Sequence, residues 1–74
     1  MVSTQDQFDT VSRYAEESER RAERMAEVVA HLKKHGQSAE SAEKQMSQFH
    51  AMARGYRDRR DQLQAQILAK RRES

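Results

Sequence analysis

The sequence has 74 residues and a formal net charge of +2, with 35% charged and 35% apolar residues, two Gly, no Pro and no Cys. A chain this short forms at most one small domain, here taken as residues 1–74, and the lack of Cys excludes disulfides and thiolate metal sites. Abundant Ala, Glu, Arg and Gln with so little Gly and Pro is typical of long helices and coiled coils rather than sheets.

The first predicted element is a helix over about residues 4–35. Thr4 and Gln7 have the spacing of a capping box, in which each side chain satisfies a free backbone N–H at the start of a helix. Apolar residues then recur at alternating steps of three and four, which predicts a coiled-coil seam. The seam residues of this helix are Phe8, Val11, Ala15, Ala22, Met25, Val29 and Leu32.

A turn is predicted at residues 36–38, followed by a second helix over about 38–71. Gly36 suits the left-handed position that closes a helix, and Ser38 is a favourable N-cap for the next one. The 3–4 spacing resumes in the second helix. Its seam residues are Ala42, Met46, Phe49, Ala53, Tyr56, Leu63 and Ile67.

A turn this short makes the two helices antiparallel neighbours, so the sequence predicts an all-α fold: a two-helix antiparallel coiled-coil hairpin. The seams then face each other around Gly36, with Val29 near Met46, for example. Arg60 falls on the seam, and we expect its guanidinium to reach Glu16 or Glu19 of the first helix.

The predicted seam is thin, because many of its residues are Ala and bury little area. A second stripe beside the seam contains Tyr14, Val28 and Met52, and Leu68 adds an apolar residue near the far end. We therefore expect these residues to contact a partner, with hairpins self-associating into a helical bundle or docking on a helix of another protein.

An Arg-rich run in the second helix supports two interpretations. Arg54, Arg57 and Arg59 form either a basic stripe that contacts nucleic acid or a partner protein, or a solvated face with ordinary ion pairs. Asp58 and Asp61 interrupt the run, which favours the second interpretation.

Gly55 lies inside the second predicted helix and away from the seam. It marks either a close approach of a partner helix or a tolerated surface position, and the sequence leaves both alternatives open.

Metal and catalytic sites are not indicated. His31 and His35 share one helix face, but no third ligand converges on them, so we interpret them as surface residues. The sequence has no cysteine nucleophile or phosphate-binding Gly-rich loop, and two helices offer no pocket for a small-molecule substrate. No cofactor and no enzymatic activity are therefore expected.

The function that the sequence favours is a non-enzymatic protein–protein interaction module, such as a small adaptor or chaperone-like protein. One alternative is a nucleic-acid-binding regulatory dimer that uses the Arg-rich run, and another is a structural coiled-coil subunit of a larger assembly. The first residues lack the basic and apolar segments of a signal peptide, and no apolar run approaches the roughly 20 residues that span a bilayer. We therefore expect a cytoplasmic protein without membrane contacts, and export by a route that needs no cleavable signal stays open.

Overall fold

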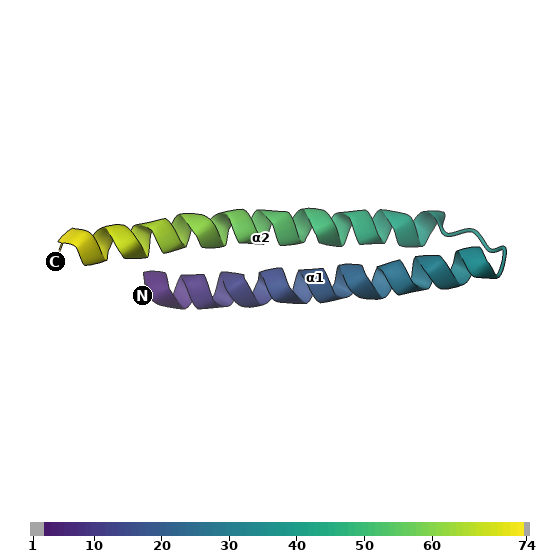
Figure 1. The fold of residues 1–74 in the computed structure, drawn as a ribbon, viewed down its shortest axis with the longest axis horizontal. Helices are drawn as coiled ribbons and strands as arrows, with labels where there is room; N and C mark the ends of the chain where they lie inside the picture. The colour runs from purple at the N-terminus through teal and green to yellow at the C-terminus, as the bar shows by residue number, and fades with distance from the viewer. Residues whose placement is uncertain (1–2, 74) are drawn as a thin grey trace.

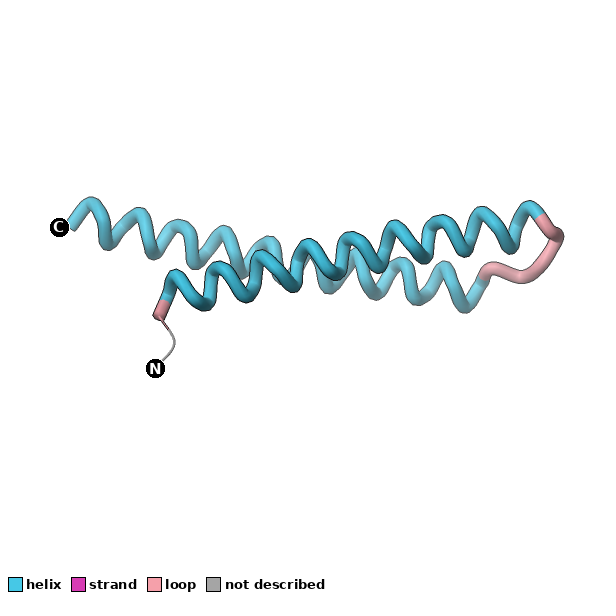
Figure 2. Tube along the Cα trace, turned by 90° about the horizontal axis from the view of Figure 1, so that it is seen from below, coloured by secondary structure: helices cyan, strands magenta, loops and turns pink. Residues whose placement is uncertain are grey.

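The computed structural model describes residues 3–73 and contains two helices, α1 (Thr4–Lys34) and α2 (Glu40–Glu73), which fold back on each other (Figure 1). The prediction of an all-α helical hairpin is confirmed, since the helices pack together and the described residues form no strand. The particle measures 60 × 18 × 14 Å. Seen from below, the helices cross gently along their length (Figure 2). The start of α1 and the end of α2 therefore lie at one end of a rod, with the turn at the other.

The N-cap of α1 is Ser3, one residue before the predicted Thr4. The Ser3 backbone is extended, its hydroxyl accepts a hydrogen bond from the Asp6 N–H at 3.1 Å, and its carbonyl accepts one from the Gln7 N–H at 3.0 Å. The prediction of Thr4 as the cap is therefore wrong. Ser and Thr stand side by side, and the cap falls on serine, which ranks above threonine at this position.

Gly36 closes α1 from the left-handed region, with φ at 69°. The Gly36 N–H donates to the Lys33 carbonyl at 3.1 Å, and the Gln37 N–H donates to the Leu32 carbonyl at 2.8 Å. This pair of bonds is a Schellman motif, which satisfies carbonyls that the end of the helix would otherwise leave free. The chain therefore reverses direction here because glycine adopts this φ without strain.

The second helix begins at Glu40, because the first helical bond runs from the Glu43 N–H to the Ala39 carbonyl at 2.8 Å. Ala39 thus occupies the N-cap position, and the prediction that Ser38 caps α2 is wrong by one residue. The reason is packing. Ala39 is buried against Val29 in a small cluster near the turn, and this contact fixes where the helix starts.

The core follows the 3–4 spacing of the predicted seam, on which Ser18 and Ala39 also fall, and consists mainly of small side chains. Among residues 3–73, the buried ones are Ala15, Ser18, Ala22, Val29, Ala39, Ala42, Ala53 and Leu63. The larger seam residues are half-buried: Phe8, Val11, Met25, Leu32, Met46, Phe49, Tyr56 and Ile67. Because two helices cover such side chains from only one direction, the hairpin leaves much of its own apolar surface in contact with solvent.

Candidate protein-interaction surface

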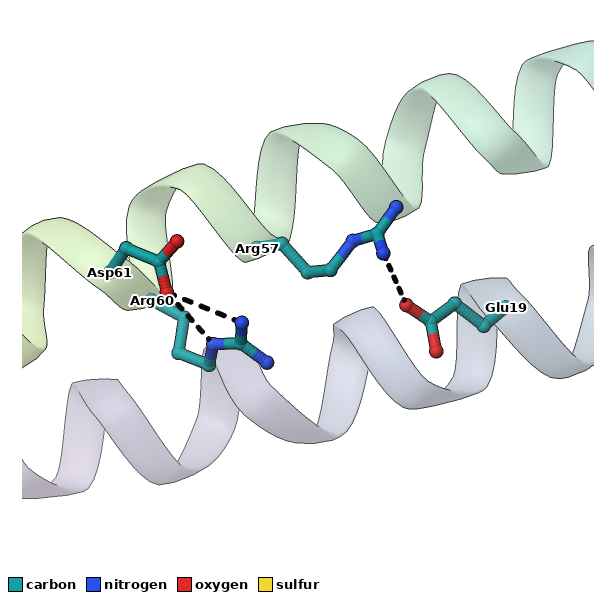
Figure 3. Close-up of polar contacts among 4 residues, drawn as sticks. All are labelled: Glu19, Arg57, Arg60 and Asp61. Carbon is teal, nitrogen blue, oxygen red and sulfur yellow. Dashed lines mark hydrogen bonds and ion pairs between the residues drawn. The ribbon is translucent and has the colours of Figure 1, made fainter.

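The two long flanks of the hairpin differ in chemistry. On one flank, ion pairs join the helices: Glu19 with Arg57 at 3.2 Å (Figure 3) and Lys33 with Glu43 at 3.1 Å. Each of these residues directly follows a seam position. We call this side the ion-pair flank. The four charged groups of these two pairs are already matched within one chain.

The opposite side, which we call the open flank, consists of the positions that directly precede a seam position in each helix and point away from the ion pairs. In α1 these positions are Gln7, Thr10, Tyr14, Glu17, Arg21, Arg24, Val28 and His31. In α2 they are Ser41, Gln45, Gln48, Met52, Gly55, Arg59, Gln62, Gln66 and Ala69. Most are exposed.

Three large apolar side chains of the open flank are exposed: Tyr14 at 45%, Val28 at 42% and Met52 at 42%. Tyr14 packs on the edge of the seam, where its ring centroid lies 5.5 Å from that of Tyr56. The inner edge of the ring thus contacts the core while the outer part faces solvent. This half-covered arrangement is typical of aromatic residues at protein interfaces.

Arg21 is a member of this surface that sequence reasoning missed. Its guanidinium carbon lies 5.9 Å from the centre of the Phe49 ring, so the cation sits over the exposed edge of the seam. The spacing of the sequence does mark Arg21 as part of this surface. Residue 21 falls seven places after Tyr14 and seven before Val28, which puts all three in one row of the helix.

A shallow groove of about 400 Å³ opens on the same flank near the ends of the chain. Residues of both helices line it, and the surface that they turn toward the groove is mostly apolar. These residues are Gln7, Thr10, Val11, Arg59 and Leu63. Val11 and Leu63 form its floor as seam residues, and the others belong to the open flank. The groove therefore lets a neighbouring side chain reach the core of the hairpin.

Leu68 does not join this surface. It is 48% exposed, but it lies on the outer side of α2, away from the open flank. Of the four flanking apolar residues singled out in the sequence, the structure thus brings Tyr14, Val28 and Met52 to one flank and leaves Leu68 apart.

The Arg-rich run is dispersed around α2. Arg57 points to the ion-pair flank and pairs with Glu19, Arg59 lies on the open flank within 3.4 Å of Gln62, and Arg54 lies on the outer side. The three arginines singled out in the sequence therefore do not converge on one basic patch.

The prediction that Arg60 reaches Glu16 or Glu19 is wrong. Both Nε and Nη2 of Arg60 donate to Oδ1 of the adjacent Asp61, at 3.3 and 3.2 Å (Figure 3). Glu19 is instead taken by Arg57, and Glu16 lies 3.8 Å from Arg20. A carboxylate next in sequence holds the guanidinium without the loss of side-chain freedom that reaching across the seam requires.

His31 and His35 contact each other near the turn, with ring centroids 4.4 Å apart and ring planes tilted by 53°. Within residues 3–73, no three His, Cys, Asp or Glu side chains gather as metal ligands would.

Neither α1 nor α2 is both long and apolar enough to cross a bilayer, as far as the described residues extend. No protein-family model, curated protein or solved structure matches this chain.

Proposed function

We propose that this chain is a non-enzymatic protein-interaction module: a small helical adaptor, or chaperone-like protein, that binds helical surfaces through its open flank. The observation that carries the proposal is the asymmetry between the flanks. Ion pairs within the chain occupy one side, whereas the other exposes Tyr14, Val28 and Met52 along its length and has a mostly apolar groove near the chain ends.

This surface is incomplete in a single hairpin. Exposed large apolar residues gathered on one face, next to half-buried core residues, gain free energy when a partner removes them from water. An amphipathic helix suits such a site, because its apolar side chains enter the gap between two helices at steps of three and four residues.

Binding of nucleic acid is the weaker alternative. It requires several uncompensated cations on one surface, whereas Arg54, Arg57 and Arg59 lie on different sides of α2 and Arg57 has a carboxylate partner at 3.2 Å.

The test compares a triple variant, Tyr14→Ser, Val28→Ser and Met52→Ser, with the control Leu68→Ser, which alters a similarly exposed residue outside the open flank. Each protein is characterised by sedimentation and by quantitative affinity purification. We expect the triple variant to lose self-association or protein partners that the wild type and the control retain, while circular dichroism still shows helix. A wild-type protein that remains monomeric and retains the same partners as the triple variant would contradict the proposal.

A further inference from the structure

The open flank of α2 is poor in charge. Thirteen of the 34 residues of α2 are charged, but among the nine open-flank positions from Ser41 to Ala69 only Arg59 is. Depletion of charge along one exposed face distinguishes the core of a protein interface from ordinary surface.

The same stripe is nearly symmetric about Gly55. Residues at nearly equal distances before and after Gly55 form matching pairs. These pairs are Met52 and Arg59, Gln48 and Gln62, Gln45 and Gln66, and Ser41 and Ala69. A two-fold interface requires a surface that complements itself, because residue i meets j where j meets i. When α2 crosses an antiparallel copy of itself at Gly55, Gln meets Gln, small residues meet small residues, and the aliphatic stem of Arg59 covers Met52 of the second copy.

Gly55 is otherwise unexplained within one hairpin. A Cβ added at this position would meet no atom within 4 Å, and the φ of Gly55 is not positive. Glycine inside a helix is destabilising relative to alanine, so neither space nor backbone conformation requires it here. At the centre of a helix crossing, however, the missing side chain lets two backbones approach closely.

The open flank of α1 is complementary about residue 19. Antiparallel pairing of two copies there places Glu17 opposite Arg21, and Tyr14 opposite Arg24. Each is a favourable contact, the first an ion pair and the second a cation over an aromatic ring, and the symmetry makes each contact twice.

The two centres lie level with each other in the hairpin. The Glu19–Arg57 ion pair, at 3.2 Å, and the Tyr14–Tyr56 ring contact, at 5.5 Å, together place residue 19 of α1 level with the segment 51–57 of α2. Gly55 lies within that segment. One axis perpendicular to the helices therefore serves both crossings.

The exposed area also fits pairing. The chain exposes 5897 Å², whereas a compact monomer of 8.7 kDa exposes about 4,700 Å². The excess, about 1,200 Å², exceeds the roughly 800 Å² that each partner buries in a standard interface.

We infer that the partner of the open flank is a second copy of this chain, and that the two hairpins form an antiparallel four-helix bundle about a two-fold axis at Gly55. This inference rests on the proposed function, because it names the occupant of the same surface. The bundle covers Tyr14, Val28 and Met52 and leaves the ion-pair flanks on its outside.

The first experiment uses Gly55→Arg and the matched control Ala51→Arg. Both residues are exposed on α2, but Ala51 lies on the outer side, so both variants add the same charge and only one adds it at the axis. By equilibrium sedimentation the wild type should have about twice the 8.7 kDa mass of one chain. Gly55→Arg should weaken the dimer at least about thirtyfold, as expected for a central interface residue, and Ala51→Arg should leave it unchanged.

The second experiment tests the register by a charge swap. Glu17→Arg and Arg21→Glu each place like charges opposite each other at two symmetric points, and each should weaken the dimer about tenfold. The double variant restores opposite charges across the interface and should recover most of the lost affinity. Failure of the double variant to recover would overturn the proposed axis.

The outcomes separate this inference from the proposed function. A dimer that Gly55→Arg and Ala51→Arg affect equally would show that another face is used, and would overturn the inference. A monomeric wild type that loses a protein partner in the Tyr14, Val28 and Met52 triple variant would also overturn it, while supporting the proposed function. A monomeric wild type whose partners do not depend on those residues would overturn both.

Discussion

Leu63 is the largest side chain that the hairpin buries completely, with 1% of its surface exposed. Most of the other buried residues are alanines, which set how closely the helices approach but contribute little area. Stability in this molecule is therefore concentrated in a few residues, and the seam position of a leucine decides how much it contributes.

A comparison of Leu63→Ala with Leu68→Ala tests whether stability is concentrated in the seam, because both variants remove the same atoms from a leucine. Removing Leu63 leaves a cavity in the seam and should lower the free energy of unfolding by about 2–5 kcal/mol. Removing Leu68, which is 48% exposed, should change it by less than about 0.5 kcal/mol. Urea denaturation of both variants at the same protein concentration measures the difference. Equal losses would mean that the core does not follow the seam.

At the scale of the helices, the ion-pair flank sets alignment more than stability. Glu19 and Arg57 are 3.2 Å apart, but their side chains remain 43% and 47% exposed, so water and salt screen the attraction. The pair is therefore expected to favour this alignment of α1 and α2 over shifted ones while adding little to the free energy of unfolding.

A double-mutant cycle with Glu19→Gln and Arg57→Gln checks this. The coupling energy should be about 0.2–1 kcal/mol at low salt and should shrink in about 1 M NaCl, where the Debye length falls to about 3 Å. Glu16→Gln with Arg57→Gln is a suitable control, because Glu16 lies near Arg20 instead. A coupling that persists in high salt would contradict the screened description.

The helices and their pairing were predictable from the sequence, because the 3–4 spacing of apolar residues and the single turn at Gly36 each have one simple solution. The capping residues were less predictable, because adjacent candidates such as Ser3 and Thr4 differ by too little energy for local rules to separate them. The partner of Arg60 was not predictable, since several carboxylates lay within reach of a long side chain. The open flank was only partly predicted. Tyr14, Val28 and Met52 were found by their hydrophobicity, whereas Arg21 is marked by its place in the seven-residue row.

The whole molecule is a rod rather than a globule. Its radius of gyration is 17.0 Å, against about 11 Å for a compact chain of this length. In such a shape almost every residue is near solvent, so a single hairpin has little interior to hold it together. Stability should therefore depend on association.

Thermal unfolding should accordingly shift with protein concentration. A hundredfold increase adds about 2.7 kcal/mol to a dimer, which should raise the midpoint by roughly 5–10 °C for two chains of this size. Gly55→Arg should unfold at a lower midpoint than the wild type at each of these concentrations, because its dimer is weaker. A wild-type midpoint independent of concentration would show that one hairpin is stable without a partner.

The hairpin in Figure 1 has a direction: the turn is at one end, and the start of α1 and the end of α2 are at the other. The inferred two-fold axis is perpendicular to the long axis of the hairpin, so the two copies in the dimer point in opposite directions. The paired molecule is bipolar, with a turn and a set of chain ends at each pole. Two proteins joined to the chain ends of the two copies would then be held apart by about the 60 Å length of the rod rather than side by side. In this arrangement the bundle is a spacer with two equivalent ends, and its length is set by the number of residues between Gly36 and the ends of the helices.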